Sequence, residues 1–322
     1  MNNVMLKIFA GYTIPFIILI IVLVLYFRIA NHFKIIDKPN ERSSHTDPTI
    51  RGGGIIFLLA VILFFFWSGF TYPFLLFGLL ISGIVSFIDD IRPLPNLVKF
   101  SAHLASVVLI FKETGIVSSI HPLYLVAIAI LMIGVINAYN FMDGINGITG
   151  LYSLAVIFPL CLTETNDQLQ SLDIFLLMGL LVFNFFNTRK KARCFAGDVG
   201  SISLAIAIVF LLIMRVQSTG NFTFIGMLLI YGIDAVYTIV QRLYQRENIF
   251  KPHRKHLYQY FSNEKKIPHV RVSIIYALTQ LLINLAIVYS YLNFLNLLLL
   301  LISLSVIYWS VKMPLIKKFT TS

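Results

Sequence analysis

The sequence predicts an all-α, polytopic membrane protein, a helical bundle with about 11 transmembrane helices. Of its 322 residues, 58% are hydrophobic and only 12% are charged, and the mean hydropathy is +0.86. Soluble domains contain about 45–50% apolar and about 25% charged residues. Apolar segments long enough to cross about 30 Å of hydrocarbon recur along the whole chain. Because no Gly/Ser-rich or Pro-rich linker divides it, we expect one integral membrane domain over residues 1–322.

The predicted spans follow from the runs of apolar residues. In chain order they cover about residues 9–30, 53–69, 72–88, 100–113, 122–138, 148–163, 172–187, 201–216, 222–243, 270–291 and 294–312. A backbone in hydrocarbon must satisfy its hydrogen bonds internally, so we expect each span to be a helix. Very short connections, such as Ser68-Gly69 and Asn293, predict antiparallel neighbours.

Lys and Arg gather in the loops that follow odd-numbered spans. These cations are Lys34, Lys38, Arg42, Arg51, Arg92, Lys99, Arg189, Lys190, Lys191, Arg193, Arg246, Lys251, Arg254, Lys255, Lys265, Lys266, Lys312, Lys317 and Lys318. The opposite side holds only Lys7, Lys112 and Arg215. The positive-inside rule therefore predicts an outer N-terminus and a cytoplasmic C-terminus. Topology and anionic lipid account for the net charge of +11, so we expect no nucleic-acid partner.

The chemistry-bearing residues lie on the predicted cytoplasmic side. The loops at about residues 31–52, 89–99, 137–147, 188–201 and 244–270 hold clustered Asp, Asn, His and Gly residues. The outer loops offer scattered acids without Gly-rich turns or histidine clusters. This asymmetry predicts a site on the cytoplasmic face.

Asp89-Asp90 closes the third span. A carboxylate at a helix C-terminus opposes the macrodipole, and two adjacent ones increase the cost. A cation should therefore offset them, and Mg²⁺ binds through one or two carboxylates plus substrate phosphates. The alternative is an ordinary charged loop end balanced by Arg92.

Four Asx residues follow the fifth span, at Asn137, Asn140, Asp143 and Asn146. The first three are spaced by three residues and would share one face of a helix. Their oxygens would suit a hydrated metal or a nucleotide base, and the glycine at Gly144 allows a sharp turn. The alternative is a polar helix cap.

Gly197-Asp198-Val199-Gly200-Ser201 opens the eighth span. A Gly-rich turn at a helix N-terminus presents free N–H groups and suits a phosphate. The alternative is a plain N-cap at Asp198.

The first cytoplasmic loop carries Arg42, His45 and Arg51, the last directly before three glycines, Gly52–Gly54. Arg side chains bind phosphate bidentately, and glycines allow close backbone approach. The alternative is a loop that is basic only because of topology.

The longest cytoplasmic loop holds His253, Arg254 and His256. The two histidines are three residues apart, so one helical turn could direct both to one site. Phosphate contact is favoured over zinc, because no Cys or acid lies nearby in sequence; a solvated basic loop is the alternative. Within the ninth span, Asp234 is an intramembrane carboxylate and so a functional candidate, with Arg242 as a suggested partner.

In this order, the motifs resemble those of the polyprenyl-phosphate N-acetylhexosamine-1-phosphate transferases, the bacterial glycosyltransferase family 4 enzymes that initiate O-antigen and teichoic acid. The likeness covers about residues 37–260. It rests on Asp37-x-Pro39-x-x-Arg42-x-x-His45, Arg51-Gly52-Gly53, Asp89-Asp90, Asn137-x-x-Asn140-x-x-Asp143-Gly144-x-Asn146-Gly147, Gly197-Asp198-x-Gly200-Ser201 and the His253–His256 segment.

The resemblance implies a reaction in the bacterial inner membrane. Undecaprenyl phosphate would attack the β-phosphorus of a UDP-N-acetylhexosamine, and UMP would leave. A homodimer is compatible with the family.

The resemblance also implies roles for individual residues. Asp198 would be the Mg²⁺ ligand, with Mn²⁺ as a substitute ion. Asp89 and Asp90 would position the metal or the lipid phosphate, and Asp143 joins Asp198 and Asp89 in the expected metal set. Asn140 and Asp143 would hold the nucleotide, beside Asn137 and with Asn146 near the uracil. Lys99, Arg42, His45, Arg51 and the His253, Arg254 and His256 segment would contact substrate, chiefly its phosphates.

The sequence departs from the family at two points. His103 stands where the family usually has Gln, and the three-histidine run of the muramoyl-pentapeptide enzymes is missing. The missing run argues against the peptidoglycan precursor as donor. The ending His256-Leu257-Tyr258-Gln259 resembles that of the O-antigen branch, which implies GlcNAc or a 6-deoxy N-acetylhexosamine as the sugar, for O-antigen or another envelope polysaccharide. A transporter or binding protein for a phosphorylated or lipid-linked solute is the alternative function. Transporters place polar sites near the bilayer midplane, whereas these motifs crowd one surface.

Overall fold

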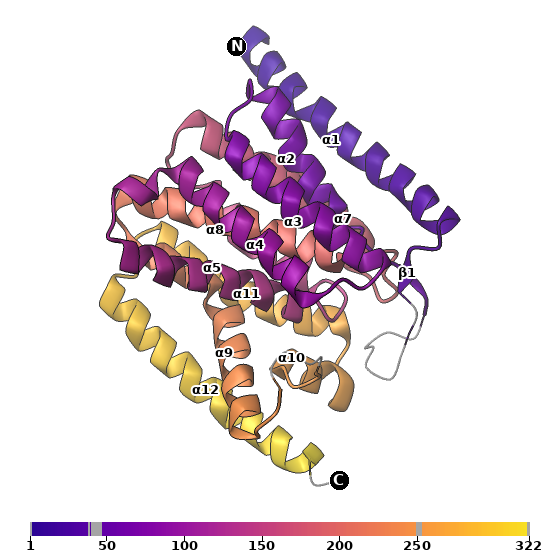
Figure 1. Ribbon diagram of the computed structural model, residues 1–322, viewed down its shortest axis with the longest axis vertical. Coiled ribbons are helices and arrows are strands. Elements are labelled where there is room, and N and C mark those ends of the chain that lie inside the picture. The colour runs from indigo at the N-terminus through magenta and orange to yellow at the C-terminus, as the bar shows by residue number, and fades with distance from the viewer. Residues whose placement is uncertain (1, 38, 40–46, 249–252, 321–322) are drawn as a thin grey trace.

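The chain folds into a bundle of helices (Figure 1). The computed structural model describes residues 2–37, 39, 47–248 and 253–320. In Figure 1, α1 (Asn2–His32) and α12 (Phe294–Thr320) lie on opposite sides of the bundle. Between them come β1 (Ile36–Asp37), β2 (Thr49–Ile50), α2 (Ile55–Trp67), α3 (Pro73–Ile91), α4 (Asn96–Thr114), η1 (Ile116–Ser118), α5 (Pro122–Met142), α6 (Ile148–Leu160), α7 (Asp167–Asn187), α8 (Gly197–Thr219), η2 (Phe222–Leu228), α9 (Leu229–Tyr244), α10 (Leu257–Gln259), η3 (Tyr260–Glu264) and α11 (His269–Val288).

The protein is an all-α, multi-pass membrane protein. In the part of the chain that the structure describes, eight helical segments are long and apolar enough to cross a membrane. They are α1, α3, α5, α7, α8, η2 with α9, α11 and α12. The other predicted spans fall on α2 and α6, which have 13 residues each, and on α4, which carries Lys99, Lys112 and Glu113. The total of eleven spans therefore stays a prediction.

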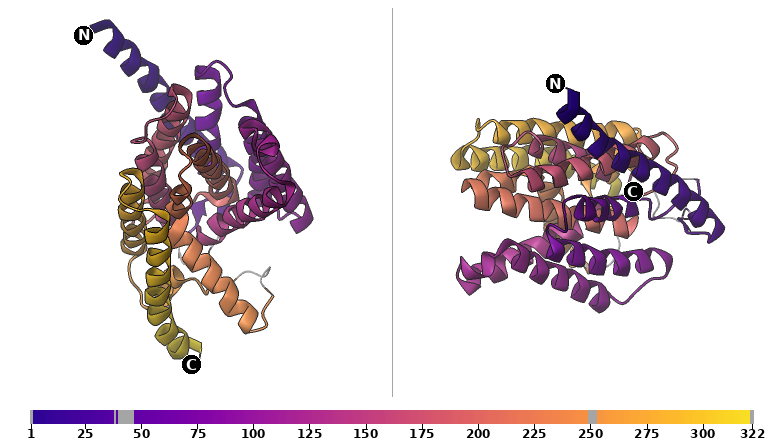
Figure 2. Two further views of the ribbon diagram at one scale, coloured as in Figure 1. Left: turned by 90° about the vertical axis from the view of Figure 1, so that its left-hand side faces the viewer. Right: turned by 90° about the horizontal axis from the view of Figure 1, so that it is seen from above.

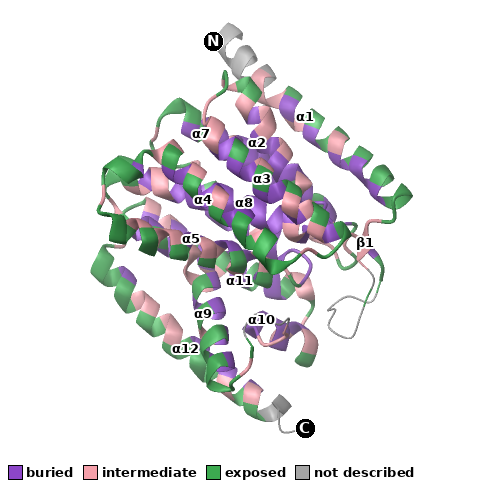
Figure 3. Cartoon of the chain, viewed as in Figure 1, coloured by how far each residue is buried: buried purple, intermediate pink, exposed green. Residues whose placement is uncertain are grey.

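The centre of the bundle is α8. It contacts α2, α3, α4, α5 and α6, and most of its side chains are buried (Figure 3). A helix that is apolar all round belongs in such an interior position. By contrast, α1, α5 and α12 expose large apolar side chains, among them Ile14, Ile130 and Ile302, as expected of surfaces that face lipid.

The helix α9 leaves the bundle at an angle. Figure 2 shows its C-terminal end leaning away from the neighbouring helices. The N-terminal end of α9 still packs against α5 and α11, and its outer part packs against α12.

A short extended segment connects the first loop to the start of α8. β1 and β2 pair in antiparallel register, Ile36 with Ile50 and Asp37 with Thr49. Ile50 also bridges Cys194 in parallel. The amides of Gly53 and Gly54 donate to the carbonyls of Phe195 and Ala196, at 2.8 and 3.0 Å. The loop after β2 is therefore fixed against the segment that leads into α8.

This contact requires glycine on both sides. A Cβ on Gly54 would lie 2.3 Å from the Cα of Gly200, and a Cβ on Gly200 would lie 2.6 Å from the Cα of Gly54. Both neighbours are backbone atoms, which cannot rotate away. The Gly-rich pattern at both motifs thus reflects backbone packing as well as any ligand.

Two cations that the sequence assigned to loops are buried instead. Arg215 pairs with Asp173, and both side chains are fully enclosed. Lys312 is also fully buried, and its Nζ donates to Thr238 Oγ1 at 2.7 Å. Cations within a membrane-embedded bundle are costly unless paired, and both of these have partners. Removing Arg215 and Lys312 takes one cation from each predicted side of the membrane. The excess of Lys and Arg in the predicted cytoplasmic loops therefore remains.

We predict that Gly54→Ala destabilises the bundle. The added methyl group overlaps the α8 backbone, and such overpacking costs about 1–3 kcal/mol. Thermal unfolding in detergent should show a lower midpoint than that of the native chain. Gly134→Ala is the matched control, because a Cβ there meets open space. An unchanged midpoint for Gly54→Ala would contradict the packing described here.

Candidate active site

Most of the predicted polar motifs meet at one end of the bundle, where α3 and α5 end and α8 begins. We call it the site end. Arg51 comes from the loop after β2, Asp89 and Asp90 from the last turn of α3, Asn140 from α5 and Asp198 from the first turn of α8. The sequence predicted this convergence of distant motifs.

Asp90 joins α3 to the start of α8. Its side chain is fully buried. Oδ1 accepts from the Asp198 amide at 2.9 Å and Oδ2 from the Val199 amide at 3.1 Å, while Arg51 Nε lies 2.7 Å from Oδ1. The first amides of a helix lack intrahelical partners and carry partial positive charge, so a carboxylate there is stabilising. Both Asp90 oxygens are therefore engaged by the protein itself.

Gly197 makes this capping geometry possible. Its φ is +71°, a conformation that side-chain-bearing residues rarely adopt. A Cβ at Gly197 would lie 2.5 Å from Asp90 Oδ2. Glycine is thus required both for the turn and for the approach of Asp90.

Asp89 and Asp198 face one another beside this junction, and their carboxyl groups are close enough to interact directly. Asp89 accepts from the Leu94 amide at 2.6 Å and from Lys99 Nζ at 3.0 Å. Asp198 accepts from Arg51 at 3.2 Å and from Asn140 at 3.3 Å. Two carboxylates are thus held together with a cation on either side.

The same side chains meet the requirements of Mg²⁺ only in part. Within the described ranges, no three His, Cys, Asp or Glu side chains come close enough together to hold a metal ion alone. Asp89 and Asp198 form a pair. Two carboxylates, with substrate phosphates completing the shell, are a common Mg²⁺ arrangement. The donor set fits an ion that arrives with a phosphate-bearing substrate.

Asp143 lies at the end of α5, near the same region. Its Oδ1 accepts from Thr149 Oγ1 at 2.7 Å. Burial, opposed by the hydrogen bond from Thr149 and assisted by the charge of Asp198, raises the pKa of Asp143 to about 6. Perturbed carboxyls of this kind cluster at functional sites. Asn140, one turn earlier, donates to Asp198 and accepts from Ser201 Oγ at 3.1 Å.

The guanidinium of Arg51 pairs with both Asp90 and Asp198. Burial alone would lower the pKa of Arg51, but the charges of Asp90 and Asp198 raise it above its usual value. Arg51 therefore carries its charge at any physiological pH and offsets two of the carboxylates.

Two of the predicted Asx residues lie elsewhere. Asn137 is exposed and donates to the Ile133 carbonyl of its own helix at 2.9 Å. Asn146 is buried and donates to the carbonyls of Arg189 and Lys190, while its Oδ1 has no hydrogen-bond partner among the described residues. Asn146 thus ties the α5–α6 turn to the segment after α7.

The predicted basic segment lies against α9. His256 Nδ1 lies 3.2 Å from Asp234 Oδ1, and the Leu257 amide donates to the same oxygen at 3.1 Å. The suggested pairing of Asp234 with Arg242 is wrong, because Arg242 is directed to Glu247 and to the Asn248 carbonyl. Asp234 therefore contacts His256, 22 positions further along the chain, in place of the expected Arg242.

His253 stacks beside His256, with 4.9 Å between ring centroids. Burial, together with the nearby His256, Arg242, Lys312 and Lys255, lowers the pKa of His253 to about 3. His253 is therefore neutral at physiological pH. Positive charge toward a phosphate would have to come from Arg254 rather than from His253.

Sequence reasoning missed Tyr258 and Asn187. Tyr258 Oη donates to the Phe141 carbonyl at 3.1 Å and would be 2.2 Å from a Cβ on Gly144. Asn187 accepts from the Gly147 amide at 2.7 Å and donates to the Cys194 carbonyl at 2.8 Å. The glycines at 144 and 147 signalled close contacts, but nothing in the sequence identified the side chains that make them.

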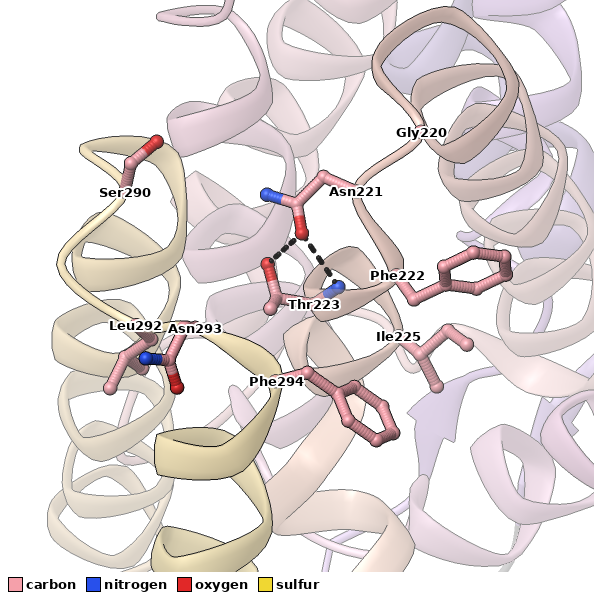
Figure 4. A pocket seen from close by; sticks show the side chains of 9 residues that line it. All are labelled: Gly220, Asn221, Phe222, Thr223, Ile225, Ser290, Leu292, Asn293 and Phe294. Carbon is pink, nitrogen blue, oxygen red and sulfur yellow. Dashed lines mark hydrogen bonds between the residues drawn. The ribbon is translucent and has the colours of Figure 1, made fainter.

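Arg42 and His45, both predicted to bind substrate, lie outside the described residues. A pocket at the far end of the bundle is lined by residues 220–223, 225, 290 and 292–294 (Figure 4). In it, Asn221 Oδ1 accepts from the amide and hydroxyl of Thr223. None of the lining residues is ionisable, so this pocket lacks the groups that the predicted chemistry needs.

Comparison with known proteins finds one matching family model and several similar proteins. The family model described as "Glycosyl transferase family 4" matches residues 72–216, which include Asp89, Asp90, Lys99, Asn140, Asp143 and Asp198. The chain is 23% identical, over 79% of its length and 77% of the relative, to the probable undecaprenyl-phosphate N-acetylglucosaminyl 1-phosphate transferase of Bacillus subtilis.

Two further relatives are named for two different sugar-phosphate groups. The undecaprenyl-phosphate alpha-N-acetylglucosaminyl 1-phosphate transferase of Thermotoga maritima is 25% identical, over 80% of this chain and 82% of the relative. A phospho-N-acetylmuramoyl-pentapeptide-transferase of Dictyoglomus thermophilum is 27% identical, over 62% of this chain and 70% of the relative.

We predict that the adjacent carboxylates Asp89 and Asp90 differ in their effect on stability. Asp90→Asn removes the charge that pairs with Arg51 and places an NH₂ group against one of the two backbone amides that Asp90 accepts from. Loss of such charged hydrogen bonds should lower the free energy of unfolding by about 2–3 kcal/mol. Asp89→Asn weakens a pair with Lys99, whose side chain is 28% exposed, and relieves repulsion with Asp198, so it should cost about 1 kcal/mol or less. Denaturant or thermal unfolding of both variants tests this; equal losses would contradict the assignment.

Proposed function

Because the chain belongs to the polyprenyl-phosphate N-acetylhexosamine-1-phosphate transferase family, we propose that it transfers an N-acetylhexosamine-1-phosphate from a UDP-sugar to undecaprenyl phosphate. The structural observation that supports this most is the paired carboxyls of Asp89 and Asp198, flanked by Arg51 and Lys99. A site for two phosphate-bearing substrates needs both a metal-binding pair and fixed cations.

The proposed orientation puts the N-terminus outside and the site end at the cytoplasmic face of a bacterial inner membrane. The positive-inside asymmetry supports this. In the structure, α1 begins at the far end and reaches the site end at His32, followed by β1. A cytoplasmic site is also where a UDP-sugar is available. The whole chain, residues 1–322, would act as one membrane domain.

The reaction exchanges one phosphorus–oxygen bond for another. An oxygen of the lipid phosphate bonds to the β-phosphorus of the donor, and the bond from that phosphorus to the bridging oxygen breaks, so UMP leaves. A phosphate monoester has a second pKa near 6 and is largely dianionic at neutral pH. The attacking group thus needs little help from a general base, and the main barrier is repulsion between two anions.

The side chains of this protein would relieve that repulsion. Asp198 and Asp89 would hold Mg²⁺, or Mn²⁺ in its place, with Asp143 nearby. The ion would neutralise phosphate charge and align the reacting groups. Arg51, Lys99 and Arg254 would neutralise the remaining charge. Asn140 and Asp143 would orient the nucleotide.

Asp90 acts as an organiser in this proposal and not as a base. Its two oxygens accept the α8 amides and pair with Arg51, so no lone pair is directed to a substrate without breaking the start of α8. Asp89 likewise has Leu94 and Lys99 as partners. Both observations favour positioning over proton transfer.

We propose GlcNAc or a 6-deoxy N-acetylhexosamine, such as FucNAc or QuiNAc, as the transferred sugar in the initiation of O-antigen or a related polysaccharide. Two relatives are named for N-acetylglucosaminyl transfer, which supports this choice. The missing three-histidine run argues against the muramoyl-pentapeptide donor, although relatives with that name also match.

The proposal predicts metal-dependent release of UMP. Purified full-length protein, undecaprenyl phosphate, Mg²⁺ and a panel of UDP-N-acetylhexosamines should give UMP with at least one donor. EDTA should abolish the signal, and added Mg²⁺ should restore it. Absence of UMP with every donor, in protein that remains folded and monodisperse, would reject the transferase in favour of a transporter or binding protein.

The proposal also predicts a specific defect for Asp198→Asn. Loss of a direct metal ligand should reduce turnover by about 100-fold and raise the Mg²⁺ concentration needed for half-maximal rate. The rate is measured as UMP release against Mg²⁺ concentration. Glu164→Gln, the same acid-to-amide change in an exposed residue between α6 and α7, serves as the control and should behave as the native chain. An unchanged Mg²⁺ dependence for Asp198→Asn would remove Asp198 from the metal set.

A further inference from the structure

A buried polar network joins α12 to the basic segment of the proposed site. Its centre is Asp234, whose side chain is almost completely enclosed. Five donors reach this carboxylate. They are Thr238 Oγ1 (3.2 Å), His256 Nδ1 (3.2 Å), the Leu257 amide (3.1 Å) and Tyr308 Oη (2.9 Å) on Oδ1, and Tyr276 Oη (2.7 Å) on Oδ2. The donors come from α9, α10 and its cap, α11 and α12.

The contribution of α12 is confined to one face. Most of this helix is exposed, yet Tyr308 and Lys312, which are four residues apart, are buried. Lys312 Nζ donates to Thr238 Oγ1 at 2.7 Å, so the hydroxyl proton of Thr238 is left to donate to Asp234. A helix that faces lipid has no need of a buried Lys and Tyr for its own stability, because burying them is costly unless they are engaged.

The network holds residues 253–259 in position. At one end, Asp234 holds the His256 ring and the Leu257 amide. At the other end, Tyr258 Oη donates to the Phe141 carbonyl beside Gly144. The segment that carries Arg254 is therefore held between α9 and the turn that carries Asp143. With Nδ1 bound to Asp234, His256 keeps one ring nitrogen, Nε2, without a partner among the described residues.

We propose that Tyr308 and Lys312 are positioning residues for the donor phosphates. They fix Asp234, and through it they hold the His253–His256 segment over the Asp143 turn. This inference rests on the proposed function, because it assigns that segment to the UDP-sugar. It adds a helix that lies outside the family match at residues 72–216.

The test separates donor binding from lipid binding and from turnover. UMP release by the full-length protein is measured with UDP-GlcNAc varied at saturating undecaprenyl phosphate, and then with the lipid varied at saturating donor; if another donor in the panel is the active one, it replaces UDP-GlcNAc. Tyr308→Phe and Lys312→Met should each raise the donor KM by about tenfold, the size expected for losing a hydrogen bond in a charged network. The lipid KM should stay within about twofold. Ser310→Ala, an exposed change between them on the same helix, is the control.

A double variant tests whether Lys312 acts through Asp234. Asp234→Asn removes the charge that Lys312 helps to balance. If the two residues are coupled, Lys312→Met should cost much less in the Asp234→Asn background than in the native chain. Thermal unfolding of each variant identifies any that fail to fold, and Tyr308→Phe, which keeps the ring, carries the test if Lys312→Met does not.

The possible failures are distinct. A native chain that releases no UMP with any donor rejects the proposed function. An active native chain with a normal donor KM in both variants rejects the positioning role. Equal increases in donor KM and lipid KM, together with a fall in turnover, also reject it. Such a result would indicate a general structural defect of the bundle.

Discussion

The site depends on the meeting of two helix ends, with the C-terminus of α3 against the N-terminus of α8. Asp90 is unfavourable at the end of its own helix, where its charge opposes the macrodipole. It becomes favourable because the first amides of α8, at Asp198 and Val199, donate to it. Gly197 lacks the Cβ that would collide with Asp90, and Gly54 and Gly200 lack those that would keep the loop before α2 away from α8. Without this junction, Asp198 would not face Asp89.

The same junction explains why two adjacent aspartates differ. Successive residues on an α-helix point about 100° apart, since 3.6 residues make one turn. When Asp90 is directed at the α8 amides, Asp89 must point to another side, where Lys99 and Asp198 lie. The residues themselves predicted a charged pair at this place, and only the family resemblance put Asp89, without Asp90, in the expected metal set. The different partners of Asp89 and Asp90 depend on which helix packs beside α3, and no local sequence pattern contains that information.

Local patterns predicted what depends on local physics. Apolar runs predicted helices, and Gly-rich and Asx-rich turns predicted the loops of the site. Contacts between distant segments were harder to predict. Asp234 was paired with Arg242, eight residues later in the same helix, whereas its actual partner His256 lies beyond the loop that follows α9. Lys312 was counted as a cytoplasmic cation, because burial against Thr238 depends on how α12 packs on α9. Asn146 and Asn137 were grouped by spacing, although the helix ends between them and sends them to different surroundings.

The carboxylates of this protein can be sorted by how fully the protein itself satisfies them. Asp234 receives five donors, and Asp90 has a backbone amide on each oxygen and Arg51 on Oδ1, so each serves to hold other groups in place. Asp89 and Asp198 receive two donors each and lie against one another, which leaves negative charge that neighbouring Arg51 and Lys99 only partly offset. Two close carboxylates repel unless a cation or a proton lies between them. In the proposed mechanism, a divalent cation would relieve the repulsion between Asp89 and Asp198, whereas Asp90 and Asp234 are already neutralised by groups of the protein itself.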